Sequence, residues 1–336
     1  TFRKELEQSP SMLLSPVLKM EDGYEAAEDT LVEMMKRVGV PEKSVRKAYQ
    51  FACKKQRDFE RELIDIGRET LKYLDDHPDM FAIVLFGRPY NAFADEANMG
   101  IPHKVASRGY FIIPHDMIPS DHINVDHKMF WATGQKIMKS AQIVKERKNL
   151  FGFYITNFSC GPDSFLLGYF RRIMGSKPSL TLELDQHTAD AGIDTRIEAA
   201  LDIISSYRKL GIENVEDDSF RAAKVIIDKR IKVISSEGVE YELTDPHVEI
   251  VLPSMGRYGT EMVAAILRSI GINGKALPVA EKNVLLEGRK NTSCKECLPY
   301  ILTTGSFLEY IKRKKDPDTV TLFFLPTGGG PCRLGQ

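Results

Sequence analysis

The sequence predicts an α/β fold: two Rossmann-like, doubly wound parallel-sheet domains preceded by a helical segment. Within the first 78 residues, apolar residues recur at helical spacing among charged ones. This pattern predicts helices and no strands in that part of the chain. Short apolar runs then alternate with amphipathic stretches, which is typical of parallel strands joined by crossover helices. The alternation stops near residue 213 and returns near 247, so the expected parts are 1–78, 79–213, a connecting segment over 214–246, and 247–336.

The helical lead-in is expected to contain helices over 24–38 and 41–76. Pro41 suits the first position of a helix, where its missing N–H would lack an intrahelical partner in any case. Cys53 lies on the second of these helices with no other cysteine nearby, and we expect it to be structural.

The first α/β domain is expected to alternate strands and helices. The expected strands are 81–86, 110–113, 150–156 and 179–184. The expected helices lie near 96–107, 129–147, 162–174 and 194–210. Because open α/β sheets bind ligands in the crevice beyond the carboxyl ends of their strands, the residues just after each strand are the first candidates for a site.

The connecting segment is more charged and has short β-prone pieces that fit a small antiparallel element. The second domain is expected to contain strands over 247–252, 275–279 and 319–325, and helices over 259–270 and 297–313. The chain lacks an initiator Met and stops in a Gly-rich turn where a helix should follow. We therefore expect this domain to be truncated. We also expect the chain to be part of a larger parent protein or of an oligomer.

Composition limits the classes of partner. With 46 basic and 47 acidic residues the formal net charge is -1, so no global charge argument favours nucleic acid or a membrane surface. No apolar run approaches the roughly 20 residues of a membrane helix, and the first residues lack the apolar core of a signal peptide, so we expect a cytoplasmic protein. Five cysteines are too few for a disulfide scaffold, which leaves metal binding or redox chemistry as the special interpretation.

Three cysteines share one architectural position. Cys160, Cys297 and Cys332 each follow a predicted strand or precede a predicted helix. Unpaired N–H groups and the positive end of a helix dipole stabilise anionic sulfur at such places. Gly161 and Gly330, beside two of these cysteines, would let backbone amides approach a sulfide or thiolate closely.

The chemistry of these cysteines stays open on the residues alone, since a single cysteine at a helix start is more often inert. Cys294 and Cys297 form a CxxC pair, which suits zinc, an iron–sulfur cluster or a dithiol redox pair. Zinc is disfavoured because Cys160 and Cys332 stand singly with no histidine beside them. A thioredoxin-like pair is disfavoured because no convincing strand precedes it.

Several runs together resemble the 2-hydroxyacyl-CoA dehydratase-related portion of large acyl-CoA dehydratase activase proteins. The runs are 87–91 (GRPYN), 160–165 (CGPDSF), 183–192 (ELDQHTADAG), 253–256 (PSMG), 295–299 (KECLP) and 330–336 (GPCRLGQ). The resemblance spans about 80–336, and the lead-in carries none of these motifs.

The resemblance implies a low-potential iron–sulfur cluster, [4Fe-4S] or double-cubane, with Cys160, Cys297 and Cys332 as its ligands. It also implies an ATP-hydrolysing activator domain or subunit as the electron donor, an acyl-CoA as a candidate substrate, and oxygen sensitivity. Cys294 is a departure, because such proteins commonly have glycine there, and we favour a spare thiol over an added ligand. No GxxxxGK[ST] loop occurs, so ATP hydrolysis would lie outside this chain.

Other polar groups near strand ends are weaker candidates. Arg88 follows a strand and could pair with an anionic cluster or a CoA phosphate. An acidic cluster could ligate a metal, although a capped helix start explains Asp194 more simply. His115 with Asp116 lacks a third partner and is expected to be structural. The acidic cluster, which includes a histidine, consists of Glu183, Asp185, His187, Asp190 and Asp194.

Two functions remain in competition. The first is an iron–sulfur, electron-accepting component of a dehydratase or reductase system, which would not be a self-sufficient enzyme. The second is a non-catalytic scaffold or interaction domain of a larger activase protein, without a cluster of its own.

Overall fold

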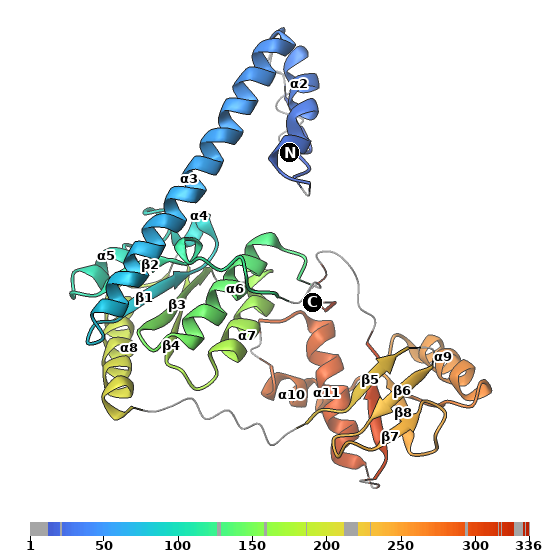
Figure 1. Ribbon diagram of the computed structural model, residues 1–336. Helices are drawn as coiled ribbons and strands as arrows, with labels where there is room; N and C mark the ends of the chain where they lie inside the picture. The colour runs from blue at the N-terminus through green and yellow to red at the C-terminus, as the bar shows by residue number, and fades with distance from the viewer. Residues whose placement is uncertain are drawn as a thin grey trace. The chain divides into compact units, whose positions relative to one another are not determined.

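The computed structural model forms two compact units, Thr1–Leu71 and Lys72–Gln336. Its secondary structure confirms the predicted class, a mixed α/β protein with two parallel sheets and an N-terminal helical segment (Figure 1). The structure describes residues 13–20, 22–125, 129–157, 160–185, 187–211, 221–228, 230–292, 295–314, 316, 318–325, 332 and 334–335.

The N-terminal segment is helical, as its apolar periodicity predicts. A short 3-10 turn, η1 (Tyr24–Ala27), leads into α2 (Glu28–Lys36), and α3 (Glu42–Asp76) follows. Arg46 of α3 forms an ion pair with Asp29 of α2 at 2.8 Å. Cys53 is buried on α3, in agreement with a structural role.

The first parallel sheet has the order β2-β1-β3-β4. Its strands are β1 (Ala82–Phe86), β2 (Phe111–Pro114), β3 (Leu150–Asn157) and β4 (Ser179–Leu184), close to the predicted bounds. In register, Ala82 of β1 faces Phe111 of β2 on one side and Leu150 of β3 on the other. Every residue of β1 is buried, which fits a central strand covered on both faces.

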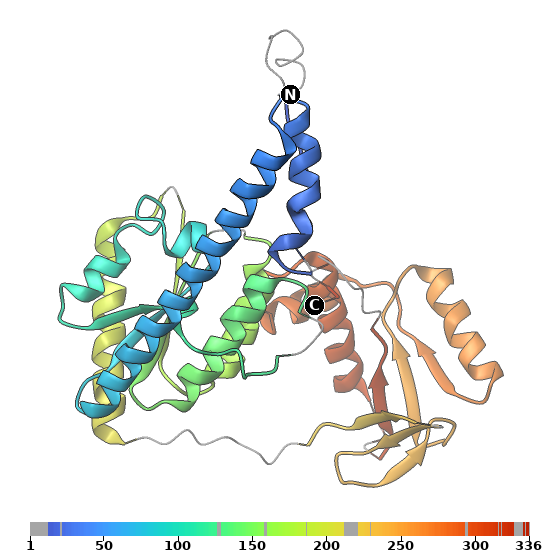
Figure 2. The same cartoon turned by 45° about the horizontal axis from the view of Figure 1, so that its top comes forward.

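Helices cover both faces of this sheet (Figures 1 and 2). They are α4 (Pro89–Ala92), α5 (Ile101–Ala106), the 3-10 turn η2 (His115–Met117), α6 (Ala132–Glu146), α7 (Asp163–Met174) and α8 (Asp190–Leu210). Alternate strand residues divide between the faces. Ile83 packs in the cluster that holds α5 and α8 residues, whereas the ring of Phe86 meets that of Phe170 of α7 at 5.0 Å.

Two helices of this domain begin elsewhere than predicted. The helix expected near 96–107 is only α5, because α4 and a loop precede it. The helix expected from 194 begins at Asp190, so Asp194 is not at a helix start and the capping explanation of Asp194 is wrong. The first turn of α8 contains Gly192, and glycine is a weak helix former, so the sequence pattern did not reveal this beginning.

The connecting segment contains the small antiparallel element that its β-prone pieces suggest. It is a sheet of order β5-β6-β7, formed by β5 (Lys224–Ile227), β6 (Ile231–Ile234) and β7 (Glu240–Glu242).

The second parallel sheet has the order β10-β8-β9. Its strands are β8 (Val248–Leu252), β9 (Asn273–Ala276) and β10 (Val320–Phe323), and its helices are α9 (Arg257–Ser269), α10 (Lys282–Lys290) and α11 (Leu298–Arg313). The sequence did not predict α10. Within the part of the chain that the structure describes, no helix combines the length and the apolar composition needed to span a bilayer.

Candidate functional site

The order of the first sheet places a topological switch point between the carboxyl ends of β1 and β3. From β1 the chain moves to β2 on one side, then crosses to β3 on the other side, so the connections after β1 and β3 diverge. Open α/β sheets bind their ligands at this switch point. The turn after β1 carries Arg88, and the turn after β3 leads to Cys160.

Arg88 and Cys160 meet there. The Arg88 guanidinium Nη2 donates a hydrogen bond to Cys160 Sγ, and the backbone N–H of Asp163 donates to the same sulfur at 3.4 Å. Gly87 permits the approach of the two turns: its φ is +148°, and a Cβ at this position would lie 2.7 Å from the carbonyl oxygen of Ile155 in β3. The switch point therefore holds a half-buried thiol with two N–H donors.

A buried carboxylate, that of Asp163, lies next to Arg88 and Cys160. Asp163, the first residue of α7, is 1% exposed and accepts hydrogen bonds from Tyr154 Oη at 3.1 Å and Thr156 Oγ1 at 2.5 Å. Its Oδ1 lies 3.7 Å from Arg88 Nε. An acidic residue also suits the first turn of a helix. The sequence motifs contained Asp163 but did not reveal this role, because Tyr154 and Thr156 face it only once β3 and α7 are formed.

His115 holds the turn after β1. It is completely buried, and its Nε2 lies 3.0 Å from the Gly87 carbonyl oxygen. Burial lowers the pKa of His115 to about 4, so the ring is neutral at pH 7 and the Nε2–H tautomer donates to Gly87. His115 is therefore structural, as predicted, and it positions the residue that precedes Arg88.

Opposing effects act on the Cys160 thiol. Burial raises its pKa, as does the Asp163 carboxylate, while the Asp163 backbone N–H and the Arg88 charge act in the opposite direction. The net direction is upward, so the free thiol is mainly protonated at neutral pH. Binding of a metal at this sulfur would release a proton.

The other predicted site residues are placed as follows. Gly161 lies in the turn before α7, with open space where a Cβ would be. Cys297 is the N-cap residue of α11 and is half-buried. Cys332 is exposed beyond β10, and Gly330 and Cys294 lie outside the described residues.

The described residues do not gather these cysteines into one ligand set. No group of three or more His, Cys, Asp or Glu side chains arranged to hold a metal occurs among them. Two N–H donors at the Cys160 sulfur would stabilise a ligand thiolate there, whereas burial and the Asp163 carboxylate act against the anion. The fit to an iron–sulfur cluster therefore rests on Cys160 alone.

The acidic cluster is divided among separate interactions. Asp190 and Asp194 of α8 bind Lys104 of α5 at 3.1 and 2.7 Å. Asp185 accepts hydrogen bonds from the Thr188 hydroxyl and from the His187 N–H, both at 2.9 Å, and these two bonds lower the pKa of Asp185. Glu183 forms an ion pair with Lys295 at 2.5 Å, so these carboxylates act as structural partners in the described chain.

Residues 2–118 match the family model described as a CoA enzyme activase uncharacterised domain. This part of the chain is activase-related. The comparison with curated proteins found no match, nor did the comparison with solved structures. The matched residues of this activase-related region include the helical segment, which the motifs had left out, and extend through Arg88 to η2.

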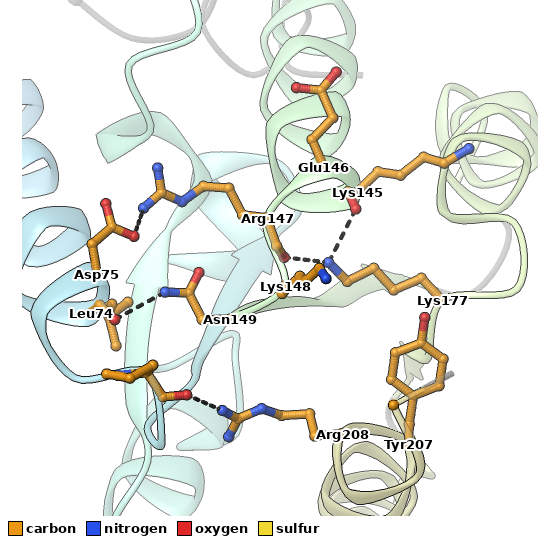
Figure 3. A pocket seen from close by; sticks show the side chains of 12 residues that line it. Leu74, Asp75, Lys145, Glu146, Arg147, Lys148, Asn149, Lys177, Tyr207 and Arg208 are labelled. Carbon is orange, nitrogen blue, oxygen red and sulfur yellow. Dashed lines mark hydrogen bonds and ion pairs between the residues drawn. The ribbon is translucent and has the colours of Figure 1, made fainter. Parts of the chain in front are cut away.

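A basic cavity lies at the opposite, amino-terminal edge of the first sheet (Figure 3). It has a volume of about 610 Å³ and five basic side chains line it. Lys177 is 4% exposed and donates to the carbonyl oxygens of Val144 (2.6 Å), Lys145 (3.2 Å) and Arg147 (2.5 Å) at the end of α6. The basic side chains are those of Lys145, Arg147, Lys148, Lys177 and Arg208.

Three of the basic side chains of this cavity, those of Lys177, Arg147 and Arg208, serve the fold. Arg147 binds the Asp75 carboxylate, and Arg208 donates to the backbone of Pro78 (2.7 Å) and Asp79 (2.8 Å) (Figure 3). Cations near helix C-termini stabilise the helix dipole and its unpaired carbonyls. The switch point is therefore the better candidate for function.

Proposed function

We propose that this chain is an iron–sulfur, electron-accepting component of an acyl-CoA dehydratase or reductase system that works with an ATP-hydrolysing activator. The observation that carries the proposal is the Cys160 sulfur at the switch point, with the Arg88 guanidinium and the Asp163 N–H as donors. The activase-related match over residues 2–118 supports the same class of system.

The protein groups have separate roles in this proposal. Cys160, Cys297 and Cys332 would hold the cluster, which when bound would supply low-potential electron acceptance. Arg88 offsets negative charge at the sulfur. It would thereby tune the reduction potential of the cluster, which depends on hydrogen bonds to the cluster sulfurs and on local charge. Asp163 and His115 keep Arg88 and its turn in place.

The test is iron and acid-labile sulfide content after anaerobic reconstitution, with EPR after reduction. We expect about four irons per chain or more, the content of one [4Fe-4S] cluster. Cys160→Ala, Cys297→Ala and Cys332→Ala should each lose iron, and Cys53→Ala, at a buried helical position, is the matched control that should keep it. Iron retained in Cys160→Ala would contradict the assignment.

A scaffold domain without a cluster is the second candidate. The observation that favours it is that the described residues gather no metal-binding group. Absence of iron from the reconstituted wild-type protein, with the far-UV circular dichroism of a folded chain, would support the scaffold and overturn the first proposal.

A further inference from the structure

The small antiparallel sheet has an exposed apolar edge (Figure 1). Its order is β5-β6-β7, so within the described chain β5 has a strand partner on one side only. All four residues of β5 are exposed, Ile227 by 79% and Val225 by 48%. An edge strand of this kind presents backbone N–H and C=O groups beside apolar side chains, which makes it a template for a further strand.

The register of the β5–β6 hairpin shows which backbone groups of β5 point to the open edge. The backbone N–H of Asp228 donates to the carbonyl oxygen two residues later, across the turn from β5 to β6, at 3.3 Å. In an antiparallel ladder, alternate residues direct their N–H and C=O groups to the same side. The backbone groups of Lys224 and Ile226 therefore face β6. Those of Val225 and Ile227 point to the open edge.

A second copy of β5, running antiparallel, complements the first in one register. When Ile226 faces its own counterpart across a two-fold axis, Val225 faces Ile227 of the second copy, and their outward backbone groups can exchange hydrogen bonds. The same register places Lys224 opposite Asp228 of the second copy, once on each side of the axis. Both side chains are exposed, and opposite charges that face each other across two strands stabilise the pairing.

This pairing would also join two apolar surfaces. Val225 lies opposite Val233 of β6, which in turn lies opposite Tyr241 of β7, so these three side chains share one face. Ile227 and Ile231 form the next facing pair on the same side of the sheet, and Ile231 is also exposed. Two copies would form one six-stranded sheet with a continuous apolar face.

The other edge of the small sheet favours an assembly that stops at two copies. β7 has only three residues, and two of them are glutamates, Glu240 and Glu242. Short strands and charged side chains discourage strand addition at an edge. A pairing of β5 with β5 uses one edge of each copy and leaves only the β7 edges outside, so the contact closes and does not propagate into a fibre.

We propose that β5 is a self-association surface, at which two copies of this chain pair their β5 strands antiparallel about Ile226. The register with Lys224 opposite Asp228 favours a second copy over a strand from another protein. Because β5 is short, the dimer is weak and its fraction depends on concentration. The inference requires neither a cluster nor a ligand.

The test is sedimentation velocity of the full chain at concentrations from micromolar to millimolar. A reducing agent is present, because Cys332 is exposed and could otherwise link copies by a disulfide. The wild-type chain should shift from monomer to dimer. Lys224→Asp and Asp228→Lys should each weaken self-association by about tenfold or more, since each places like charges opposite each other twice.

Glu237→Lys is the matched control. It lies in the exposed turn between β6 and β7, away from the β5 edge, and it changes the net charge as Asp228→Lys does. It should dimerise like the wild type.

Mixing the two charge variants tests the register directly. Lys224→Asp has acidic residues at both positions and Asp228→Lys has basic residues at both, so one copy of each restores opposite charges at both contacts. The mixture, and the double variant Lys224→Asp/Asp228→Lys, should associate to within about threefold of the wild type. Val225→Pro removes an N–H at the open edge and no hydrogen bond to β6, so it should abolish association while the far-UV circular dichroism stays unchanged.

A wild-type chain that stays monomeric at millimolar concentration would overturn the proposal and leave the β5 edge to a strand of another protein. Assemblies larger than dimers would overturn it too, because they require a contact that does not close. So would a mixture of the charge variants that stays as weak as each variant alone. The charge variants decide the question if Val225→Pro misfolds, since both lie at exposed positions.

Discussion

Arg88 is held by three different interactions at the switch point. Its guanidinium donates to Cys160 Sγ, lies beside the Asp163 carboxylate, and stacks over the Tyr90 ring with its Cζ 4.7 Å from the ring centroid. A planar, permanently charged group suits such a combination, and a lysine would not reproduce it. The position of Arg88 thus adds a positive charge to the surroundings of the thiol.

Arg88→Met should make the Cys160 thiol less acidic. Arg88 is one of the groups that lower its pKa, so its loss leaves burial less opposed. Alkylation of Cys160 by iodoacetamide at pH 7.5, followed by mass spectrometry, should slow by roughly three- to tenfold. Arg172→Met, on the exposed surface of the same α7, is the control and should alkylate at the wild-type rate. Faster alkylation in Arg88→Met would show that Arg88 mainly shields the sulfur.

His115 should make the stability of the protein pH-dependent. Its pKa is about 4 in the folded protein against 6.5 for an ordinary histidine, so the unfolded chain binds more protons between these values. Stability is therefore fully present above about pH 6.5 and is lost as the pH falls towards 4, by about 3 kcal/mol.

Urea unfolding of wild type and His115→Leu at pH 7, 6, 5 and 4.5 measures this contribution. Leucine cannot titrate, so the difference in unfolding free energy between the two proteins should shrink as the pH falls. His77→Leu, at the end of α3, is the control. A difference that stays constant with pH would mean that His115 does not carry the acid sensitivity.

At the scale of elements, the sequence predicted the strands far better than the helix beginnings. The runs that became β1, β3 and β8 are apolar and bounded by charged or glycine-rich stretches, so their periods and limits are local properties. The sequence did not predict α10, because this helix is recognised mainly by its packing against α11 through small residues. The role of Asp163 was missed for the same reason, since burial and pairing depend on neighbours distant in sequence.

The α10–α11 contact depends on two glycines. A Cβ on Gly305 would lie 2.0 Å from the carbonyl oxygen of Val284, and a Cβ on Gly288 would lie 2.0 Å from that of Ile301. Gly305→Ala should therefore force the helices apart and destabilise the protein by about 3 kcal/mol or more, as measured by chemical unfolding. Gly259→Ala in α9, where nothing lies near the added Cβ, should stabilise by about 1 kcal/mol. Equal stability of the two variants would show that the helices can separate without cost.

At the scale of the whole molecule, the two parallel sheets have separate hydrophobic cores. The main core cluster draws its buried residues from Phe81 to Ile204 only. The second sheet buries its own set, which includes Val248, Val251 and Ala264. The proposed ligands are divided in the same way, with Cys160 on the first sheet and Cys297 and Cys332 on the second, so a cluster would link two independently packed cores.

Separate cores should give separate unfolding transitions. Differential scanning calorimetry of the chain should show two endotherms, because each sheet can lose its packing without exposing the core of the other. Gly152→Ala, whose Cβ would lie 2.8 Å from the Phe170 ring, should lower one transition by roughly 3 °C or more. Gly305→Ala should lower only the other. A single endotherm that both substitutions shift would show that the two sheets unfold together. In that case, reconstitution with iron would find no separate transitions that a cluster could merge into one.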